Sequence, residues 1–362
     1  MSLDKIYALR PENFEKRFGK KSRVLVLSSK DILDAIYDEK VIVMAANTRM
    51  KHVIPGIMRA AKELDAIVAF ELAKSECDLK GGYTGFTPYT YAETLVEYAE
   101  KIGFLDHPFF IHADHTTVKN TSKEEIETAR ELLKACHEAG YSSFAIDASF
   151  NELEDNIRIT LDLAKPYDEM GFGIEVEVGE IKSTGQEAEI TTVEEAVTFI
   201  SSLADGGLTP DFLAINNGSK HGNYLEGEKI FIDLDRTGEI ANAIDKWHVR
   251  IAQHGTTGTP LHLIGRFADY GIRKANVGTH WQNIVHEHLP PELMKQMREW
   301  AEKEGKNIKH ATKQFLKEIN SIPEENVKAI EEHAYEDAKK FIEAFRAKGT
   351  ASLVLKKLME KL

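Results

Sequence analysis

The chain has 362 residues, of which 42% are apolar and 29% charged, and its formal net charge is −13 at pH 7. This charge argues against nucleic-acid binding, because a protein that binds phosphate backbones needs a basic face. No run of about 18 apolar residues is present to span a bilayer, and residues 1–21 lack the apolar core of a secretory signal. Cys77 and Cys136 are too few for a disulfide framework or a cysteine-based zinc site. We therefore expect a soluble cytoplasmic protein without nucleic-acid or membrane partners.

Short apolar and β-branched runs recur along the chain, separated by longer amphipathic segments. These runs predict eight strands, at residues 41–47, 66–72, 108–114, 143–149, 173–179, 211–218, 249–255 and 272–278. Helical spacing of apolar residues is clear in the segment 123–140, which ends at Gly140. Strands this apolar need cover on both faces. Their strict alternation with helices favours a closed (β/α)8 TIM barrel over an open doubly wound sheet.

The whole chain, residues 1–362, is interpreted as one barrel domain. Residues 1–40 are expected to form one or two helices that cap the lower mouth or the side of the barrel, and residues 41–285 form the barrel core. Residues 286–362 are almost entirely helical in pattern. This tail is predicted to act as a lid, a brace or a subunit contact.

Reactive side chains collect where the predicted strands end, which is where barrels of this kind carry their chemistry. They include His112, Asp114, His115, Asp147, Ser149, Glu175, Glu177, His221, His254, Asn276 and Thr279. His115, His221 and His254 come from three different strands. Three converging imidazoles form a site for Zn²⁺, or for Co²⁺, Fe²⁺ or Mn²⁺, with positions open to substrate oxygens. Nearby carboxylates either orient these rings or carry protons, and the pattern does not separate the two roles.

Glycine-rich segments follow the last three predicted strands. They read HGNY at 221–224, HGTTGTP at 254–260 and NVGT at 276–279. Small residues and hydroxyls at these places let backbone N–H groups close around a phosphate. Barrels often hold phosphate after strands seven and eight, so a phosphorylated small molecule is the expected ligand.

Together these motifs resemble the class II, zinc-dependent fructose-bisphosphate and tagatose-bisphosphate aldolases over roughly residues 40–285. The segment IHADH resembles the family's H-x-D-H motif, which implies that His115 binds the metal and Asp114 handles the proton at the substrate's C4 hydroxyl. EVEVG, KHGNY and QHGTTGTP resemble further family segments and imply metal contacts for Glu177, His221 and His254. The resemblance places three more side chains near the metal: His112, Asp147 and Ser149.

The resemblance also implies a substrate-binding set that holds the phosphate and hydroxyls of the dihydroxyacetone phosphate half. Its members are Asn47, Gly222, Gly255, Thr257, Asn276 and Thr279. A glutamate on the loop after the fifth strand would exchange the proton at C3, with Glu187 the first choice and Glu180 and Glu189 the fallbacks. A homodimer or homotetramer is implied, in which Lys356 of the last helix reaches a partner subunit's site.

The expected reaction is reversible cleavage of a ketose (bis)phosphate, by default fructose 1,6-bisphosphate. The products are dihydroxyacetone phosphate and an aldehyde such as glyceraldehyde 3-phosphate, through a metal-stabilised enediolate, as in glycolysis and gluconeogenesis. A Schiff-base mechanism at Lys220 or Lys274 would leave the three histidines unexplained.

Several positions depart from the family pattern: Ala73, Thr256, Thr257, Gly278 and His280. They leave the aldehyde half of the substrate open. Two alternatives therefore stand beside the aldolase, namely a metal-dependent aldolase or epimerase of another sugar, and a metal-binding barrel without catalysis.

Overall fold

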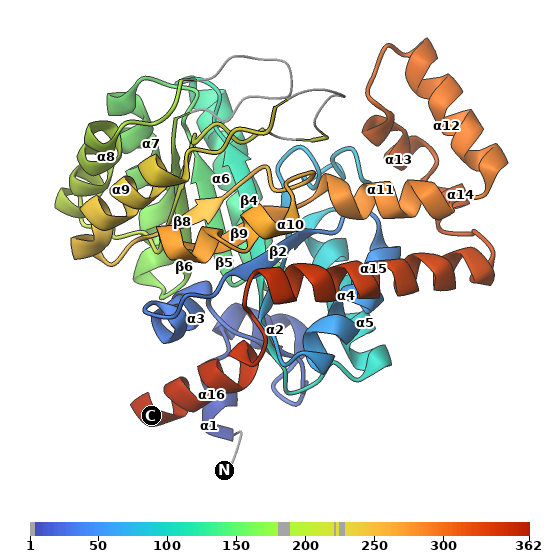
Figure 1. Ribbon diagram of the computed structural model, residues 1–362, viewed down its shortest axis with the longest axis horizontal. Helices are drawn as coiled ribbons and strands as arrows, with labels where there is room; N and C mark the ends of the chain where they lie inside the picture. Colours follow the sequence, from blue (N-terminus) through green and yellow to red (C-terminus); the bar gives the residue numbers. More distant parts are fainter. Residues whose placement is uncertain (1–3, 180–188, 221, 224–228) are drawn as a thin grey trace.

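The computed structural model describes residues 4–179, 189–220, 222–223 and 229–362 (Figure 1). The predictions for Glu180, Glu187 and His221 lie outside these described residues.

Within the described residues, eight parallel strands close into a barrel. They are β2 (Val43–Asn47), β3 (Val68–Ala73), β4 (Pro108–Thr117), β5 (Ser143–Asp147), β6 (Gly173–Val178), β7 (Phe212–Ile215), β8 (Arg250–Gln253) and β9 (Ile272–Val277). Each strand pairs with the next along the chain, and β9 pairs with β2 to close the ring. The predicted (β/α)8 barrel is confirmed, and each strand lies within a few residues of its predicted run.

Helices follow the strands and cover the outside of the barrel (Figure 1). They are α4 (Ile54–Glu63), α5 (Pro88–Ile102), α6 (Lys123–Glu138), α7 (Leu153–Glu169), α8 (Val193–Asp205), α9 (Leu234–Ile244), α10 (Leu261–Ile264) and α11 (Thr279–His288). The side chains of Thr87, Ser122 and Thr192 accept backbone N–H bonds at the starts of α5, α6 and α8, which explains why these helices begin there. None of the described helices has the length and apolar composition needed to cross a membrane.

The two ends of the chain meet at the lower mouth of the barrel (Figure 1). The elements there are α1 (Asp4–Tyr7), α2 (Glu12–Phe18), β1 (Leu25–Val26), α3 (Ser29–Ile36) and α16 (Thr350–Lys361). Apolar residues of α3 and α16 pack against strand residues that face the barrel interior near the strand starts, among them Val43, Phe110 and Phe212. The lower mouth is therefore plugged by apolar contacts, and the other mouth remains for chemistry.

The tail continues from α11 through α12 (Pro291–Lys303), η4 (Ile308–His310), α13 (Ala311–Gln314) and α14 (Leu316–Ile319) to α15 (Glu324–Ala344). α12, α13 and α14 stand beyond α11 at the upper right of Figure 1. α15 lies against α4, where Gly56 permits close approach: a Cβ at this position would lie 2.2 Å from the carbonyl oxygen of Glu331. The tail thus packs on the barrel at a point where only hydrogen fits.

Candidate active site

A bulge in β4 determines where His115 points. Successive strand residues face opposite sides, so His112 and Asp114 face the barrel interior and His115 would face outward. The pairing of β4 with β5 shifts between Ala113 and Thr116, and His115 has φ 38°, which non-glycine residues seldom adopt. The extra residue of the bulge turns His115 into the barrel beside Asp114.

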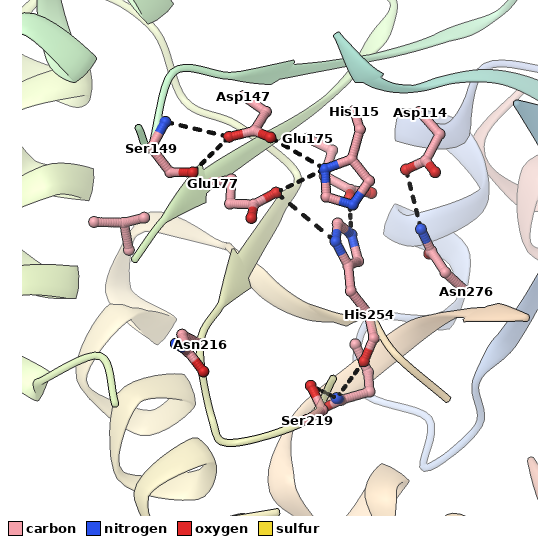
Figure 2. Close-up of polar contacts among 12 residues, drawn as sticks. Asp114, His115, Asp147, Ser149, Glu175, Glu177, Asn216, Ser219, His254 and Asn276 are labelled. Carbon is pink, nitrogen blue, oxygen red and sulfur yellow. Dashed lines mark hydrogen bonds and ion pairs between the residues drawn. The ribbon is translucent and has the colours of Figure 1, made fainter. Parts of the chain in front are cut away.

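His115 lies among carboxylates from the next two strands along the chain, β5 and β6 (Figure 2). Its Nδ1 is 3.2 Å from an oxygen of Asp147 and 3.2 Å from an oxygen of Glu177. His254, which follows β8, approaches from the other side: its Nδ1 is 3.7 Å from the same Glu177 oxygen, and the two imidazole centroids are 4.2 Å apart. Residues from four strands therefore meet at one point.

Asp114 is held by two amides from the opposite wall. Asn47 donates to its Oδ2 over 2.9 Å and Asn276 donates to its Oδ1 over 3.0 Å. One ligand atom each of Asp114, His115 and His254 lie within 4.8 Å of one another, and so do those of His115, Asp147 and Glu177. Since both groups contain His115, they form one continuous cluster of donors.

A charged layer lies beneath this cluster. Lys274 is fully buried, and its Nζ lies 2.9 Å from an oxygen of Glu71 and 2.9 Å from an oxygen of Glu175. Glu175 also accepts from Nε2 of His254 over 2.7 Å and lies 3.4 Å from Nε2 of His112. The layer therefore fixes the ring of His254 from below.

The charges in the cluster shift several pKa values. Burial lowers the pKa of His115, but Glu177 and Asp114 overcome burial and raise it well above its ordinary value. Burial raises the pKa of Asp114, but His115, Lys274 and His254 bring it below the ordinary range. For Glu177, burial and Asp147 raise the pKa. The nearby carboxylates thus favour the protonated, positively charged form of His115. A metal cation bound at the same place would balance the same negative charge.

The cluster forms one end of a cavity of about 390 Å³. Residues predicted from the sequence line it: Asn47, Asp114, His115, Asp147, Glu177, Gly222, Gly255, Thr257, Asn276 and Thr279. The backbone of Gly255 has φ +67°, and a Cβ there would lie 2.4 Å from the carbonyl oxygen of Lys220. Glycine is therefore required where the loops after β7 and β8 touch.

Comparison with known proteins agrees with this arrangement. A family-wide sequence profile described as "Fructose-bisphosphate aldolase class-II" matches residues 27–350. This chain belongs to that family. The match indicates a class II fructose-bisphosphate aldolase-like lyase, and members of this family generally depend on a divalent metal.

Individual relatives are distant. The fructose-bisphosphate aldolase of Streptococcus pneumoniae serotype 4 is 27% identical over 266 residues, covering 71% of this chain and 80% of that protein. The sulfofructosephosphate aldolase of Alkalicoccus urumqiensis is 25% identical over 260 residues, covering 70% of this chain and 80% of that protein. The solved fructose-bisphosphate aldolase of Campylobacter jejuni has a TM-score of 0.65 at 20% identity, covering 90% of this chain and 97% of that chain, and so agrees on the fold.

The donor chemistry of the cluster fits the metal that the family uses. Two imidazoles and several carboxylate oxygens converge, which suits Zn²⁺ and the other divalent first-row cations. Asp147 lies beside a ring nitrogen of His115, and such contacts orient metal-binding imidazoles. Of the described residues, His115, His254 and Glu177 could hold the ion, since Nδ1 of each imidazole faces the Glu177 carboxylate.

Other predicted residues lie outside the cavity wall. Ser149 donates to Asp147 over 2.6 Å and lines a neighbouring cavity together with Glu189, so this fallback glutamate does not line the central cavity. His112 is buried below the cluster against Ser143. Lys356 is exposed on α16, 4.0 Å from Glu360, at the plugged end of the barrel, and its contact with a partner subunit stays a prediction.

Sequence reasoning missed several cavity residues, among them Arg49, Glu76, Tyr83 and Lys309. Glu76 accepts from Nε of Arg49 over 2.7 Å and from the hydroxyl of Tyr83 over 3.0 Å. Arg49 also donates to Thr279, and Lys309 lies 5.3 Å from the centroid of the Tyr83 ring. Burial lowers the pKa of Lys309, and Arg49 lowers it further. Two cations therefore border one side of the cavity.

Gly278 explains how Arg49 enters this wall. A Cβ at this position would lie 3.0 Å from Nη2 of Arg49, so the guanidinium occupies space that a larger side chain would need. Gly278 is one of the positions that depart from the family pattern, and its lack of a side chain leaves this space to Arg49.

Proposed function

We propose that this class II aldolase reversibly cleaves a ketose bisphosphate, by default fructose 1,6-bisphosphate, into dihydroxyacetone phosphate and glyceraldehyde 3-phosphate. One observation carries the proposal: a carboxylate held by two amides, a metal-suited cluster and three basic side chains, Arg49, Lys119 and Lys309, share one cavity. The metal would be held by His115, His254, Glu177 and His221, of which His221 lies outside the described residues. Zn²⁺ is the proposed ion.

Asp114 is the proposed carrier of the proton at the C4 hydroxyl. Its lowered pKa keeps it ionised at neutral pH, so it accepts a proton as the carbon–carbon bond breaks. The amides of Asn47 and Asn276 fix its two oxygens and leave little freedom to rotate. A bound divalent cation would stabilise the negative charge that develops on the ketone side of the substrate. The second proton transfer, at C3, is assigned to the loop glutamate Glu187, outside the described residues.

The substrate carries an anion at each end, and the two sets of proposed anion contacts adjoin in the cavity, since Arg49 donates to Thr279 over 3.2 Å. Gly255, Thr257 and Thr279 are the proposed contacts of the dihydroxyacetone phosphate end. Arg49 and Lys309 favour an anionic group on the aldehyde half as well, because each brings a positive charge to the wall.

A covalent lysine mechanism has no support at Lys274. Burial lowers the pKa of this lysine, but Glu175 and Glu71 raise it above the ordinary value, so the amine stays protonated and is not a nucleophile. Lys274 is better understood as the cation that allows two carboxylates to be buried.

The test is release of triose phosphate by the zinc-loaded protein from fructose 1,6-bisphosphate and from tagatose 1,6-bisphosphate, measured in a coupled assay. Chelation by EDTA and the substitution Asp114→Asn should each abolish release, and zinc content should stay unchanged in Asp114→Asn. If zinc binds and neither sugar is cleaved, the proposed substrate is wrong. Sulfofructose phosphate is then the next ketose to assay, since its terminal anion would also meet Arg49 and Lys309.

A further inference from the structure

A second group of metal-ligating side chains lies outside the barrel, where the tail helix α15 crosses α11. Glu287 and His288 stand at the end of α11, and His333 lies on α15. One ligand atom of each residue lies within 4.8 Å of the others. None of the three lines the central cavity, so this cluster is separate from the proposed catalytic site.

The distances within the cluster are close to those of a metal site. Nε2 of His288 is 2.9 Å from Nδ1 of His333, and Nδ1 of His333 is 3.8 Å from an oxygen of Glu287. Zinc-to-nitrogen distances of about 2.0–2.1 Å at tetrahedral angles put neighbouring ligand atoms roughly 3.3 Å apart. The two printed distances lie within about half an ångström of this spacing, and all three side chains are exposed or half-buried, so small side-chain shifts would seat them on one ion.

A carboxylate stands behind the central ligand. Nε2 of His333 lies 3.6 Å from an oxygen of Asp337, one turn along α15. Asp337 is itself held by Nε2 of His280 at 2.8 Å and by Lys340 at 2.7 Å. Imidazoles that bind a metal through one nitrogen commonly donate the other N–H to a carboxylate. This carboxylate favours the tautomer of His333 that leaves Nδ1 available to the ion.

We propose that Glu287, His288 and His333 form a second divalent-cation site that ties the tail to the barrel. Two imidazoles with one carboxylate select borderline ions such as Zn²⁺ and Co²⁺ over Mg²⁺ and Ca²⁺. The bound ion bridges α15 to α11. α11 begins at Thr279 in the cavity wall, and the backbone N–H of His280 donates to Thr257 in the same wall. The site therefore braces the wall against which the substrate phosphate is proposed to bind.

The test counts Co²⁺ bound per chain by equilibrium dialysis, with the visible absorption of the bound ion as a second readout. Wild type is expected to bind two equivalents and His333→Ala one, and His262→Ala, which removes an exposed histidine of α10, should still bind two. His333→Ala binding as many equivalents as wild type would overturn the proposal.

A second, more conservative substitution is needed in case His333→Ala fails to fold. Glu287→Gln keeps the shape of a largely exposed side chain and is expected to weaken the second equivalent about tenfold while the first is unchanged. Because the count is independent of turnover, it stands or fails apart from the proposed aldolase reaction. If Glu287→Gln binds each equivalent as tightly as wild type does, Glu287 is not a ligand and the three-residue site is contradicted.

Discussion

Lys274 and Glu175 form an ion pair of 2.9 Å inside the barrel, where neither side chain is exposed to solvent by more than 2%. Removing one partner of such a pair leaves an uncompensated buried charge. Lys274→Met is therefore expected to lower the free energy of unfolding by about 3–5 kcal/mol, measured by urea denaturation. Lys356→Met, an exposed control, should change it by less than about 0.5 kcal/mol. A similarly small effect of Lys274→Met would mean that the two carboxylates are neutral in the folded protein.

Asp147 is predicted to tune metal affinity through His115. Its carboxylate lies 3.2 Å from Nδ1 of His115, and loss of such a contact typically weakens metal binding about ten- to a hundredfold. Asp147→Asn should show this loss in a zinc competition assay with a chromophoric chelator. Asp162→Asn, at an exposed position on α7, is the matched control. Equal zinc affinity in both variants would remove Asp147 from the metal site.

Arg49 and Lys309 are predicted to recognise the terminal anion of the substrate. Hydrogen bonds to charged groups contribute about 1.5–3 kcal/mol each. Arg49→Met and Lys309→Met should therefore each raise KM for the bisphosphate roughly ten- to a hundredfold, with a smaller change in kcat. Lys317→Met, at an exposed tail position, should leave KM unchanged. Steady-state kinetics that also include a ketose 1-monophosphate will test the assignment, because KM for that substrate should respond less than KM for the bisphosphate, most clearly in Lys309→Met.

Asp211 is predicted to make stability depend on pH. Burial raises its pKa from 3.8 to about 7, against the opposing effect of Lys30. Between about pH 4 and pH 7 the folded state keeps a proton that the unfolded state has lost, so the free energy of unfolding falls as pH rises through this window. The loss is on the order of 2–4 kcal/mol and is complete above the folded pKa.

Comparison with Asp211→Asn isolates this contribution. The amide can still accept the backbone N–H of Ile174, which Asp211 accepts at 2.8 Å, and it carries no charge. Chemical denaturation from pH 4 to pH 8 should give a flatter profile for Asp211→Asn than for wild type. Asp205→Asn, at an exposed position, should follow wild type. Parallel profiles for Asp211→Asn and wild type would mean that Asp211 ionises normally.

Gly56 is predicted to govern docking of the tail. Its Cβ would clash with the backbone of α15, and overpacking of this kind costs about 1–3 kcal/mol. Gly56→Ala should lower the melting temperature and increase proteolysis within the tail, even though alanine is the better helix former. If proteolysis of the tail is unchanged in Gly56→Ala, the helices separate without exposing the tail.

Local pattern was enough to predict the barrel and part of the site. Strands buried on both faces are continuously apolar, so their positions were visible in the sequence. Asp114, Glu177 and His254 lie at or just after strand ends, and barrel geometry brings such residues together. Eight strands that alternate with helices predict a closed barrel, and the pairing of β9 with β2 closes it.

Residues gathered from separate segments were not predictable in this way. Arg49, Glu76 and Tyr83 come from the segments after β2 and β3, and Lys309 joins them only because the tail returns to the cavity, so no spacing in the sequence records these contacts. Lys274 was considered only as a nucleophile, since its partners lie on two other strands. The orientation of His115 was also hidden, because simple alternation points it outward and the bulge becomes visible only from strand pairing.

The bulge in β4 has a consequence for how this scaffold can change. By turning two consecutive side chains inward, it sets the separation of Asp114 and His115 through a single peptide unit instead of through packing between elements. Loops around the mouth can then change in length or in charge without altering that separation. Mutations in these loops can therefore change which aldehyde is accepted while the separation of Asp114 and His115 stays the same.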